Sequence, residues 1–139
     1  MKKKNDWRRW ELKKVLIDSD IFVDHLRGYQ KAQDYLKRFE NGELVGYISV
    51  ITEAELSAGE KLTHLSEQEK VKNLLKIMYS IPVNSKIAWK AGELKRKYNS
   101  RLMDALIAAT AYELKVNLAT RNIKHFGMIS EIKIEQPYE

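Results

Sequence analysis

Short apolar segments alternate with longer amphipathic stretches along the chain, and this alternation constrains the fold more than any other feature. Five segments have the length of a β-strand: KVLID (14–18), LVGYIS (44–49), IPV (81–83), NLAT (117–120) and IKIEQ (132–136). The stretches between them are long enough for helices, which is typical of parallel strands joined by crossover connections. The pattern predicts an α/β fold with a mostly parallel sheet that helices cover on both faces.

Helix ends and helical spacing support this order. SDIFVDHLRG (19–28) and YQKAQDYLKRFENG (29–42) each end near a glycine, and the second has apolar side chains at the spacing of a helix face. These positions are Ala32, Tyr35, Leu36 and Phe39. Further helices are predicted at 49–61, 66–80, 84–100 and 102–116, with a short turn or helix at 121–127. The apolar residues of 84–100 that are expected to pack inward are Ile87, Ala88, Trp89, Ala91 and Leu94.

The charge of the chain is unevenly distributed. With 139 residues, the chain is long enough for one domain with a buried core and too short for two full ones. Of its net charge of +6, most lies in residues 1–14, which contain seven Lys/Arg and two acidic residues. We therefore predict a basic N-terminal arm at 1–14 and a single domain at 15–139. The arm, with Trp7 and Trp10, either contacts nucleic-acid phosphates and bases or is a plain solubilising extension.

Composition excludes several classes of protein. The chain has no cysteine, so it contains neither a disulfide nor a thiolate metal site. No apolar run approaches the length needed to cross a bilayer, and the N-terminus lacks the apolar core of a signal peptide. We expect a cytoplasmic protein that does not bind membranes.

Three acidic residues are expected to meet at one edge of the predicted sheet. Asp18 follows the first strand, while Glu55 and Asp104 lie in the early turns of two predicted helices. Converging carboxylates repel one another unless a cation lies between them, and oxygen donors suit Mg²⁺ or Mn²⁺. Each residue also has a simpler interpretation. Asp18 would cap a helix, Glu55 would form a capping box with Thr52, and Asp104 would be a favourable charge at a helix N-terminus.

Three blocks of sequence resemble a known family. VLIDSDIFVDHLRG, ISVITEAELSAG and DALIAATAYELKVNLATRNIKHF occur in the order in which PIN-domain proteins carry similar blocks. The VapC-type toxin ribonucleases of toxin–antitoxin pairs are the most similar branch, and the resemblance runs from about Val15 to the carboxyl end. It implies a PIN-like three-layer α/β/α fold and an endoribonuclease that depends on Mg²⁺ or Mn²⁺. The products would carry a 5′-phosphate and a 3′-hydroxyl.

The resemblance also assigns site residues. By motif, Asp18, Glu55 and Asp104 would bind the metal and act in catalysis, and Asn122 stands where the family usually has a fourth acid. An asparagine offers a neutral carbonyl oxygen that can orient a water molecule, but it adds no negative charge. One metal or two are therefore both compatible with the sequence.

Neighbouring residues are assigned supporting roles. The hydroxyls of Ser19 and Thr120 would hold the carboxylates or a bound water in place. The cations proposed to contact RNA are Arg121, Lys124, Lys95, Arg96, Lys97 and Arg101. No histidine is expected to bind metal, and His125 is placed on the solvent side of a turn whose Phe126 packs inward.

The resemblance implies three partners. They are an RNA substrate, a cognate VapB-like antitoxin whose tail covers the acidic crevice, and a second copy of the chain. Homodimers of the family form through the early helices, where Phe22, Leu26 and Tyr35 are available. These three residues are equally suited to the core.

Two alternative functions stay open at this point. VLIDSDIF also resembles the opening block of haloacid-dehalogenase-type phosphatases, in which Asp18 would be the nucleophile and Asp20 the acid/base. A non-catalytic PIN-like module that binds RNA or a protein would fit an asparagine at position 122. Elsewhere in the opening segment, Asp20 is expected to start a helix and Asp24 to pair with Arg27 three residues on.

Overall fold

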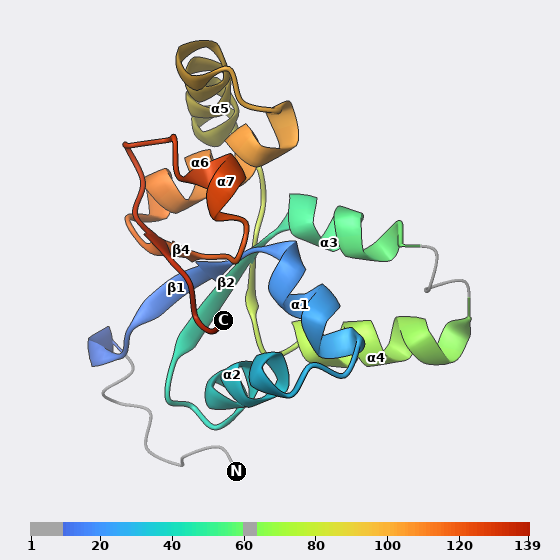
Figure 1. Ribbon diagram of the computed structural model, residues 1–139. Coiled ribbons are helices and arrows are strands. Elements are labelled where there is room, and N and C mark those ends of the chain that lie inside the picture. The colour runs from blue at the N-terminus through green and yellow to red at the C-terminus, as the bar shows by residue number, and fades with distance from the viewer. Residues whose placement is uncertain (1–9, 60–63) are drawn as a thin grey trace.

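The structure, a computed structural model, describes residues 10–59 and 64–139 of the chain. Five strands form one sheet in the order β3-β2-β1-β4-β5, and each neighbouring pair is parallel (Figure 1). The strands are β1 (Lys14–Ile17), β2 (Val45–Ser49), β3 (Tyr79–Ile81), β4 (Asn117–Ala119) and β5 (Ile134–Glu135). The predicted α/β fold is confirmed, and its sheet is wholly parallel within the described residues.

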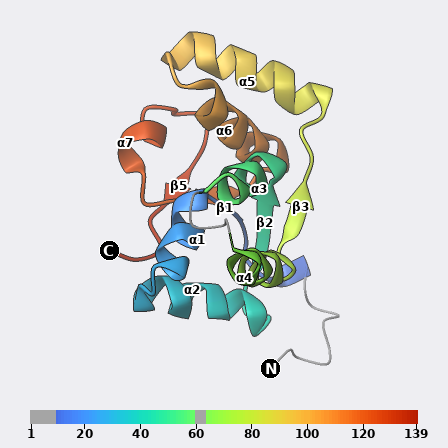
Figure 2. The same ribbon diagram turned by 90° about the vertical axis from the view of Figure 1, so that its right-hand side faces the viewer.

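Helices cover both faces of the sheet, which gives the predicted three-layer α/β/α arrangement (Figure 1, Figure 2). One layer contains α1 (Ser19–Leu26), α2 (Gln30–Glu40), α3 (Val50–Ser57) and α4 (Leu65–Leu75). The other contains α5 (Ser85–Tyr98), α6 (Leu102–Leu114) and α7 (Ile123–Phe126). As predicted, glycines follow α1 and α2. Gly28 and Gly42 have positive φ angles, which glycine adopts without strain at a helix end.

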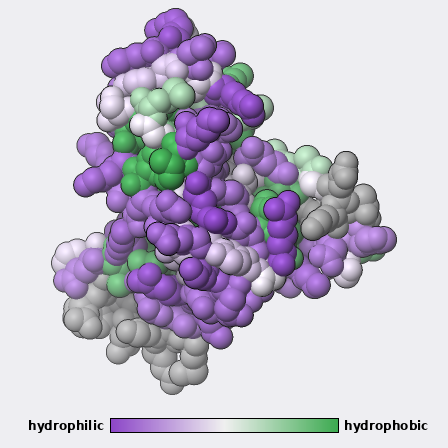
Figure 3. Space-filling view, in the orientation of Figure 1, coloured by the Kyte–Doolittle hydropathy of each residue, from purple (hydrophilic) through white to green (hydrophobic). Residues whose placement is uncertain are grey.

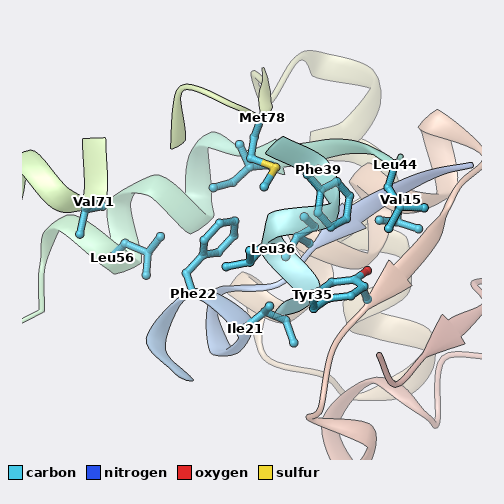
Figure 4. Packing of buried hydrophobic residues seen from close by; sticks show 13 residues of the cluster. Val15, Ile21, Phe22, Tyr35, Leu36, Phe39, Leu44, Leu56, Val71 and Met78 are labelled. Atoms are coloured by element: carbon cyan, nitrogen blue, oxygen red, sulfur yellow. The ribbon is translucent and has the colours of Figure 1, made fainter. Parts of the chain in front are cut away.

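The central strand β1 supplies side chains to both cores. Alternate residues of a strand point to opposite faces, so Val15 and Ile17 pack with α1–α4 while Leu16 packs with α5–α7. Figure 4 shows the first core, where aromatic side chains of α1 and α2 gather around Leu36. The four apolar positions predicted to face inward from α2 are all buried. β1 is therefore held on both sides, and its carboxyl end is a rigid platform.

The candidate dimer residues belong to this core. Phe22 is fully buried, Tyr35 is 7% exposed, and Leu26 packs partly buried against the same cluster. The side chains of Phe22 and Tyr35 fill the space between α1, α2 and the sheet, so they do not form a free surface, while Leu26 keeps part of its side chain exposed. Of the two roles considered for them, the structure therefore supports the core, and the homodimer stays a prediction without an assigned surface.

The helix predicted at 66–80 and the strand predicted at 81–83 have the wrong boundaries, because α4 ends at Leu75 and β3 already begins at Tyr79. β3 ends at Ile81 and does not cover 81–83, because Pro82 has no N–H to donate to a strand ladder. α3 begins directly after Ser49, whose hydroxyl accepts a hydrogen bond from the Ile51 N–H at 3.0 Å. Ser49 is thus the N-cap, which agrees with the predicted helix start, and the alternative interpretation of Thr52 and Glu55 as a capping box is wrong because Thr52 lies inside α3.

The outer face of α5 also differs from the prediction. Ile87, Ala91 and Leu94 are buried as expected, but Ala88 is exposed and Trp89 is 82% exposed. Residues two apart on a helix are separated by about 200° around its axis, so Trp89 points away when Ile87 points inward. The buried residues Ile87, Ala91 and Leu94 fix which face of α5 packs inward, and Trp89 lies on the opposite face in solvent.

Only part of the predicted basic arm is described, since residues 1–9 lie outside the described residues. Lys14, the last residue of the predicted arm, already belongs to β1. Lys13 forms an ion pair with Glu135 of β5, with Nζ and Oε2 2.8 Å apart. None of the described helices is both long and apolar enough to cross a membrane.

Gly46 in β2 occupies a position without room for a side chain. A Cβ atom there would overlap the Met78 sulfur and lie 3.0 Å from Phe39 Cδ1. Gly46→Ala is therefore expected to lower the free energy of unfolding by about 1–3 kcal/mol, measured by urea denaturation. Gly92→Ala in α5 is the control, because a Cβ there meets no atom within 4 Å, and it should raise stability by up to about 1 kcal/mol. Equal effects at both positions would contradict the close packing of β2.

Candidate active site

Asp18 is the first residue beyond β1 and the N-cap of α1. Its N–H donates to the Ala119 carbonyl at 3.0 Å, which extends the parallel ladder by one residue past the strand. Its Oδ1 accepts the Ser19 N–H at 2.9 Å. The simple capping role is therefore real, but it uses only one of the two carboxylate oxygens.

The second oxygen of Asp18 is held by Thr120, which follows β4. The Thr120 hydroxyl donates to Asp18 Oδ2 at 2.8 Å, and both residues are buried. The pKa of Asp18 is raised to about 7. Burial is the largest cause, and repulsion from Asp20 and Glu55 acts in the same direction. The hydrogen bonds from Thr120 and Ser19 lower the pKa but do not cancel this increase. Asp18 is thus a buried carboxyl whose charge no cation offsets within the described part of the chain.

Glu55 and Asp104 approach this position from two other elements. Glu55 lies in α3, which contacts both α1 and α6, and Asp104 lies in the first turn of α6. Burial raises the pKa of Glu55, repulsion from Asp104 adds to this, and a hydrogen bond with the Ser19 hydroxyl lowers it. The negative charge of Glu55 in turn raises the pKa of Asp18. Three acids from distant parts of the chain therefore interact electrostatically at one edge of the sheet, as predicted.

The chemistry of this donor set fits a hard cation. Across residues 10–59 and 64–139, neither Asp18 nor Glu55 forms an ion pair with a lysine or arginine. Among the residues that the structure describes, the buried Oδ1 atom of Asp20 has no hydrogen-bond partner. Oxygen donors with uncompensated charge suit Mg²⁺ or Mn²⁺. Within the described residues no three acidic or histidine side chains are gathered into a ready coordination cluster, so the metal ligands stay a prediction.

The predicted hydroxyl contacts are present, and the asparagine has a neighbour that the sequence did not reveal. The Asn122 N–H donates to Thr120 Oγ1 at 2.9 Å, and its Nδ2 lies 2.8 Å from His125 Nδ1. His125 Nδ1 is 3.8 Å from Asp104 Oδ2. The His125 side chain is 39% exposed and Phe126 is buried, as expected for this turn, but the imidazole also reaches toward Asn122 and Asp104. The three-residue spacing of Asn122 and His125 across one helical turn was the available signal.

The remaining aspartates of the opening segment bind the loop after β4. Asp20 Oδ2 accepts the Arg121 N–H at 2.9 Å, in addition to its place in the first turn of α1. Asp24 pairs with the Arg121 guanidinium at 2.8 Å. The predicted pair of Asp24 with Arg27 is therefore wrong. An i,i+3 pair on an exposed helix surface contributes only a few tenths of a kcal/mol, so a tertiary partner with a better position replaces it.

The predicted RNA-binding cations differ in how freely they are available. Lys124, Lys95, Arg96 and Arg101 are exposed. Lys97 is exposed too, but it pairs with Glu131 at 3.2 Å. The Arg121 guanidinium is occupied by Asp24. The available cations therefore lie at the end of α5, before α6, and on α7.

A family model described as PIN domain matches residues 15–128. The chain belongs to the PIN-domain family. It is 38% identical over 125 residues to Ribonuclease VapC10 of Mycobacterium tuberculosis, a match that covers 86% of this chain and 90% of the relative. Ribonuclease VapC19 of the same organism is 35% identical over 129 residues, with 88% and 98% covered.

Solved structures of the family superpose closely on this PIN domain. A toxin–antitoxin complex from Klebsiella pneumoniae has a TM-score of 0.76 and 30% sequence identity, with 90% of this chain and 98% of that chain covered. VapBC2 from Rickettsia felis, bound to a DNA fragment from its promoter, has a TM-score of 0.74 and 25% identity, with 88% and 97% covered. Membership of the PIN family replaces the alternative of a haloacid-dehalogenase-type phosphatase.

The raised pKa of Asp18 predicts how the stability of the PIN domain should depend on pH when EDTA removes any bound metal. A carboxyl with a pKa of about 7 when folded and an ordinary value of 3.8 binds more protons in the folded state between these values. The free energy of unfolding should fall as the pH rises through this window, and Asp18→Asn should remove that part of the decline. In EDTA at about pH 8, urea denaturation should show Asp18→Asn to be more stable than wild type by on the order of 1–4 kcal/mol.

Asp34→Asn provides the control for this measurement. Asp34 is an exposed carboxylate on α2, so Asp34→Asn makes the same chemical change as Asp18→Asn without removing a buried group. An Asp18→Asn protein no more stable than wild type above neutral pH would show that the buried carboxyl is not a source of strain.

Proposed function

We propose that this chain is a Mg²⁺- or Mn²⁺-dependent endoribonuclease and the toxin of a type II toxin–antitoxin pair. The observation that carries this proposal is the buried, uncompensated Asp18 beside Thr120, with Glu55 and Asp104 converging on it. Identity to two proteins named ribonucleases, over most of both chains, supports RNA as the substrate class.

In this proposal Asp18, Glu55 and Asp104 hold the metal, and Asn122 contributes a neutral oxygen at the rim. When bound, the metal would lower the pKa of a water molecule and neutralise charge on the scissile phosphate. The chain's own groups keep the donors in place. Thr120 and the Ser19 N–H fix the two oxygens of Asp18, and the N-terminus of α6 favours the negative charge of Asp104.

RNA would reach the site over the exposed cations Arg96, Arg101 and Lys124. Arg101 immediately precedes α6, whose first turn carries Asp104, and Lys124 lies on α7 beside Asn122. The face that presents α1, α3 and α7 is mainly hydrophilic, with a hydrophobic area near α7 (Figure 3). Positive charge around an acidic site attracts the RNA backbone while leaving the catalytic carboxylates accessible to metal.

The protein partner would be a small VapB-like antitoxin. Two structures that superpose on this chain are described as a toxin–antitoxin complex and as VapBC2, which supports this class of partner. We propose that its tail covers the acidic crevice and presents a basic side chain to the carboxylates. A homodimer and a cytoplasmic location remain part of the proposal.

A non-catalytic PIN-like module is the second candidate, and Asn122 is the observation that favours it. Loss of the usual acid removes one negative charge from the site. The two candidates differ in whether RNA is cleaved or only bound, and this difference can be measured directly.

Asp104→Asn is expected to abolish cleavage while leaving the fold intact. In the presence of Mg²⁺ or Mn²⁺, wild type should degrade purified total RNA and EDTA should stop it, while the variant loses at least roughly 100-fold in rate because a charged ligand is gone. Glu113→Gln is the control, since Glu113 lies at the other end of α6 and pairs with Lys86 at 3.3 Å. Cleavage that survives EDTA or the Asp104 substitution would contradict the mechanism, and RNA binding by wild type without cleavage would favour the module.

Arg101→Gln is expected to weaken RNA binding without changing the metal site. In an Asp104→Asn background, anisotropy of a labelled single-stranded RNA pool should show a higher Kd, and the slope of log K against log salt should fall by about 0.7 for one lost phosphate contact. Arg38→Gln on α2, which removes an exposed arginine that faces Glu43 at 3.7 Å, is the matched control. An unchanged slope for Arg101→Gln would remove Arg101 from the RNA path.

A further inference from the structure

Arg121 is bound to α1 at two points that lie one helical turn apart. Its N–H donates to Asp20 Oδ2 at 2.9 Å, and its Nη1 donates to Asp24 Oδ2 at 2.8 Å. Asp20 and Asp24 are four residues apart, so they lie on the same face of the helix. One residue thus fastens the loop after β4 to α1 through both its backbone and its side chain.

The carboxyl-terminal segment encloses this contact. The Tyr138 hydroxyl donates to the same Asp24 oxygen at 2.8 Å, and the guanidinium carbon of Arg121 lies 5.3 Å from the Tyr138 ring centroid and 5.5 Å from that of Tyr29. The Tyr29 hydroxyl in turn donates to the Glu139 carbonyl, and the C terminus lies beside α1 and α2 in Figure 2. The positive charge therefore faces a carboxylate and two aromatic rings, which all stabilise it.

This cluster is continuous with the acidic site. Thr120 precedes Arg121, and its hydroxyl lies 2.8 Å from Asp18 Oδ2 and 3.3 Å from Asp20 Oδ2. A displacement of the loop would lengthen the contact between Thr120 and Asp18, and this contact is the hydrogen bond that holds the second Asp18 oxygen. Arg121 is thus placed to set the position of Asp18 without itself touching the substrate.

We propose that Arg121, Asp24 and Tyr138 form a clamp that positions Thr120 against Asp18, and that Arg121 does not bind RNA phosphates. The inference rests on the proposed function, because the site being positioned is the nuclease site. It departs from the sequence prediction for Arg121. The Asp24 side chain is only 17% exposed, so moving the guanidinium to a phosphate would leave a shielded carboxylate without its cation.

Asp24→Asn separates the two roles, because it removes the carboxylate and leaves the arginine in place. A phosphate-binding Arg121 would be freed by this change, and affinity for RNA would rise. With a positioning clamp, Mn²⁺ binding to the RNA-free protein should weaken by about 10-fold in calorimetry, and turnover on total RNA should fall by a similar factor. The Kd for a labelled single-stranded RNA pool, measured in an Asp104→Asn background, should stay within about 2-fold.

Arg121→Gln tests the clamp from the other side. It should weaken Mn²⁺ binding in the same way and leave the salt slope of RNA binding unchanged, whereas loss of a phosphate contact would lower the slope by about 0.7. Tyr138→Phe keeps the ring and removes only the hydroxyl donor, so it should act in the same direction with a smaller effect. Arg27→Gln is the matched control, because this exposed arginine forms no ion pair among the residues that the structure covers.

Thermal unfolding, followed by circular dichroism, separates positioning from a general loss of stability. Variants with a lower Tm but with wild-type Mn²⁺ affinity and turnover well below that temperature would overturn the clamp, as would tighter RNA binding by Asp24→Asn. A wild-type protein that neither binds Mn²⁺ nor cleaves RNA would defeat the proposed function and the clamp with it. A functional wild type whose clamp variants all match it would defeat the clamp alone.

Discussion

One hydrogen bond between neighbouring strand ends organises the functional part of this molecule. Thr120, after β4, donates to Asp18, after β1, in a position where both residues are almost removed from water. Burial makes the charged form of Asp18 unfavourable, and the described part of the chain provides no lysine or arginine to offset it. The chain therefore keeps a carboxyl at a position where its charged form is unfavourable, and such strongly perturbed groups are typical of functional sites.

The two layers of helices contribute to this edge in different ways. On one side, Asp18 caps α1 at the strand end, and Asp20 and Asp24 on α1 bind the loop after β4. On the other side, the single turn of α7 buries Phe126 in the second core and directs His125 to Asp104. Because β1 packs into both cores, neither group of side chains can shift without disturbing close-packed residues. The rigidity of the site is thus a property of the sheet and both cores together.

Local sequence was sufficient for the alternating helices and strands, because burial periodicity depends on neighbouring residues. The convergence of the acids needed a further rule about the whole sheet, that the carboxyl ends of parallel strands meet at one edge. Local sequence did not predict the partner of a residue that could pair either with a neighbour in the sequence or with a residue far along the chain. Asp24 accepts hydrogen bonds from Arg121 and Tyr138 and does not pair with Arg27, and Tyr138 lies 114 positions further along the chain. Trp89 is a different case, because the phase set by Ile87, Ala91 and Leu94 would have predicted its exposure.

The separation of the site residues along the chain has a consequence for synthesis. Asp18 and Thr120 are 102 positions apart, and Asp104 and Asn122 also come late in the sequence. A ribosome that has produced α1 to α5 has made the first acids but neither the strand nor the loop that complete their surroundings. For a protein proposed to cleave RNA, the growing polypeptide would therefore remain harmless to the message being translated until β4 and the loop beyond it emerge.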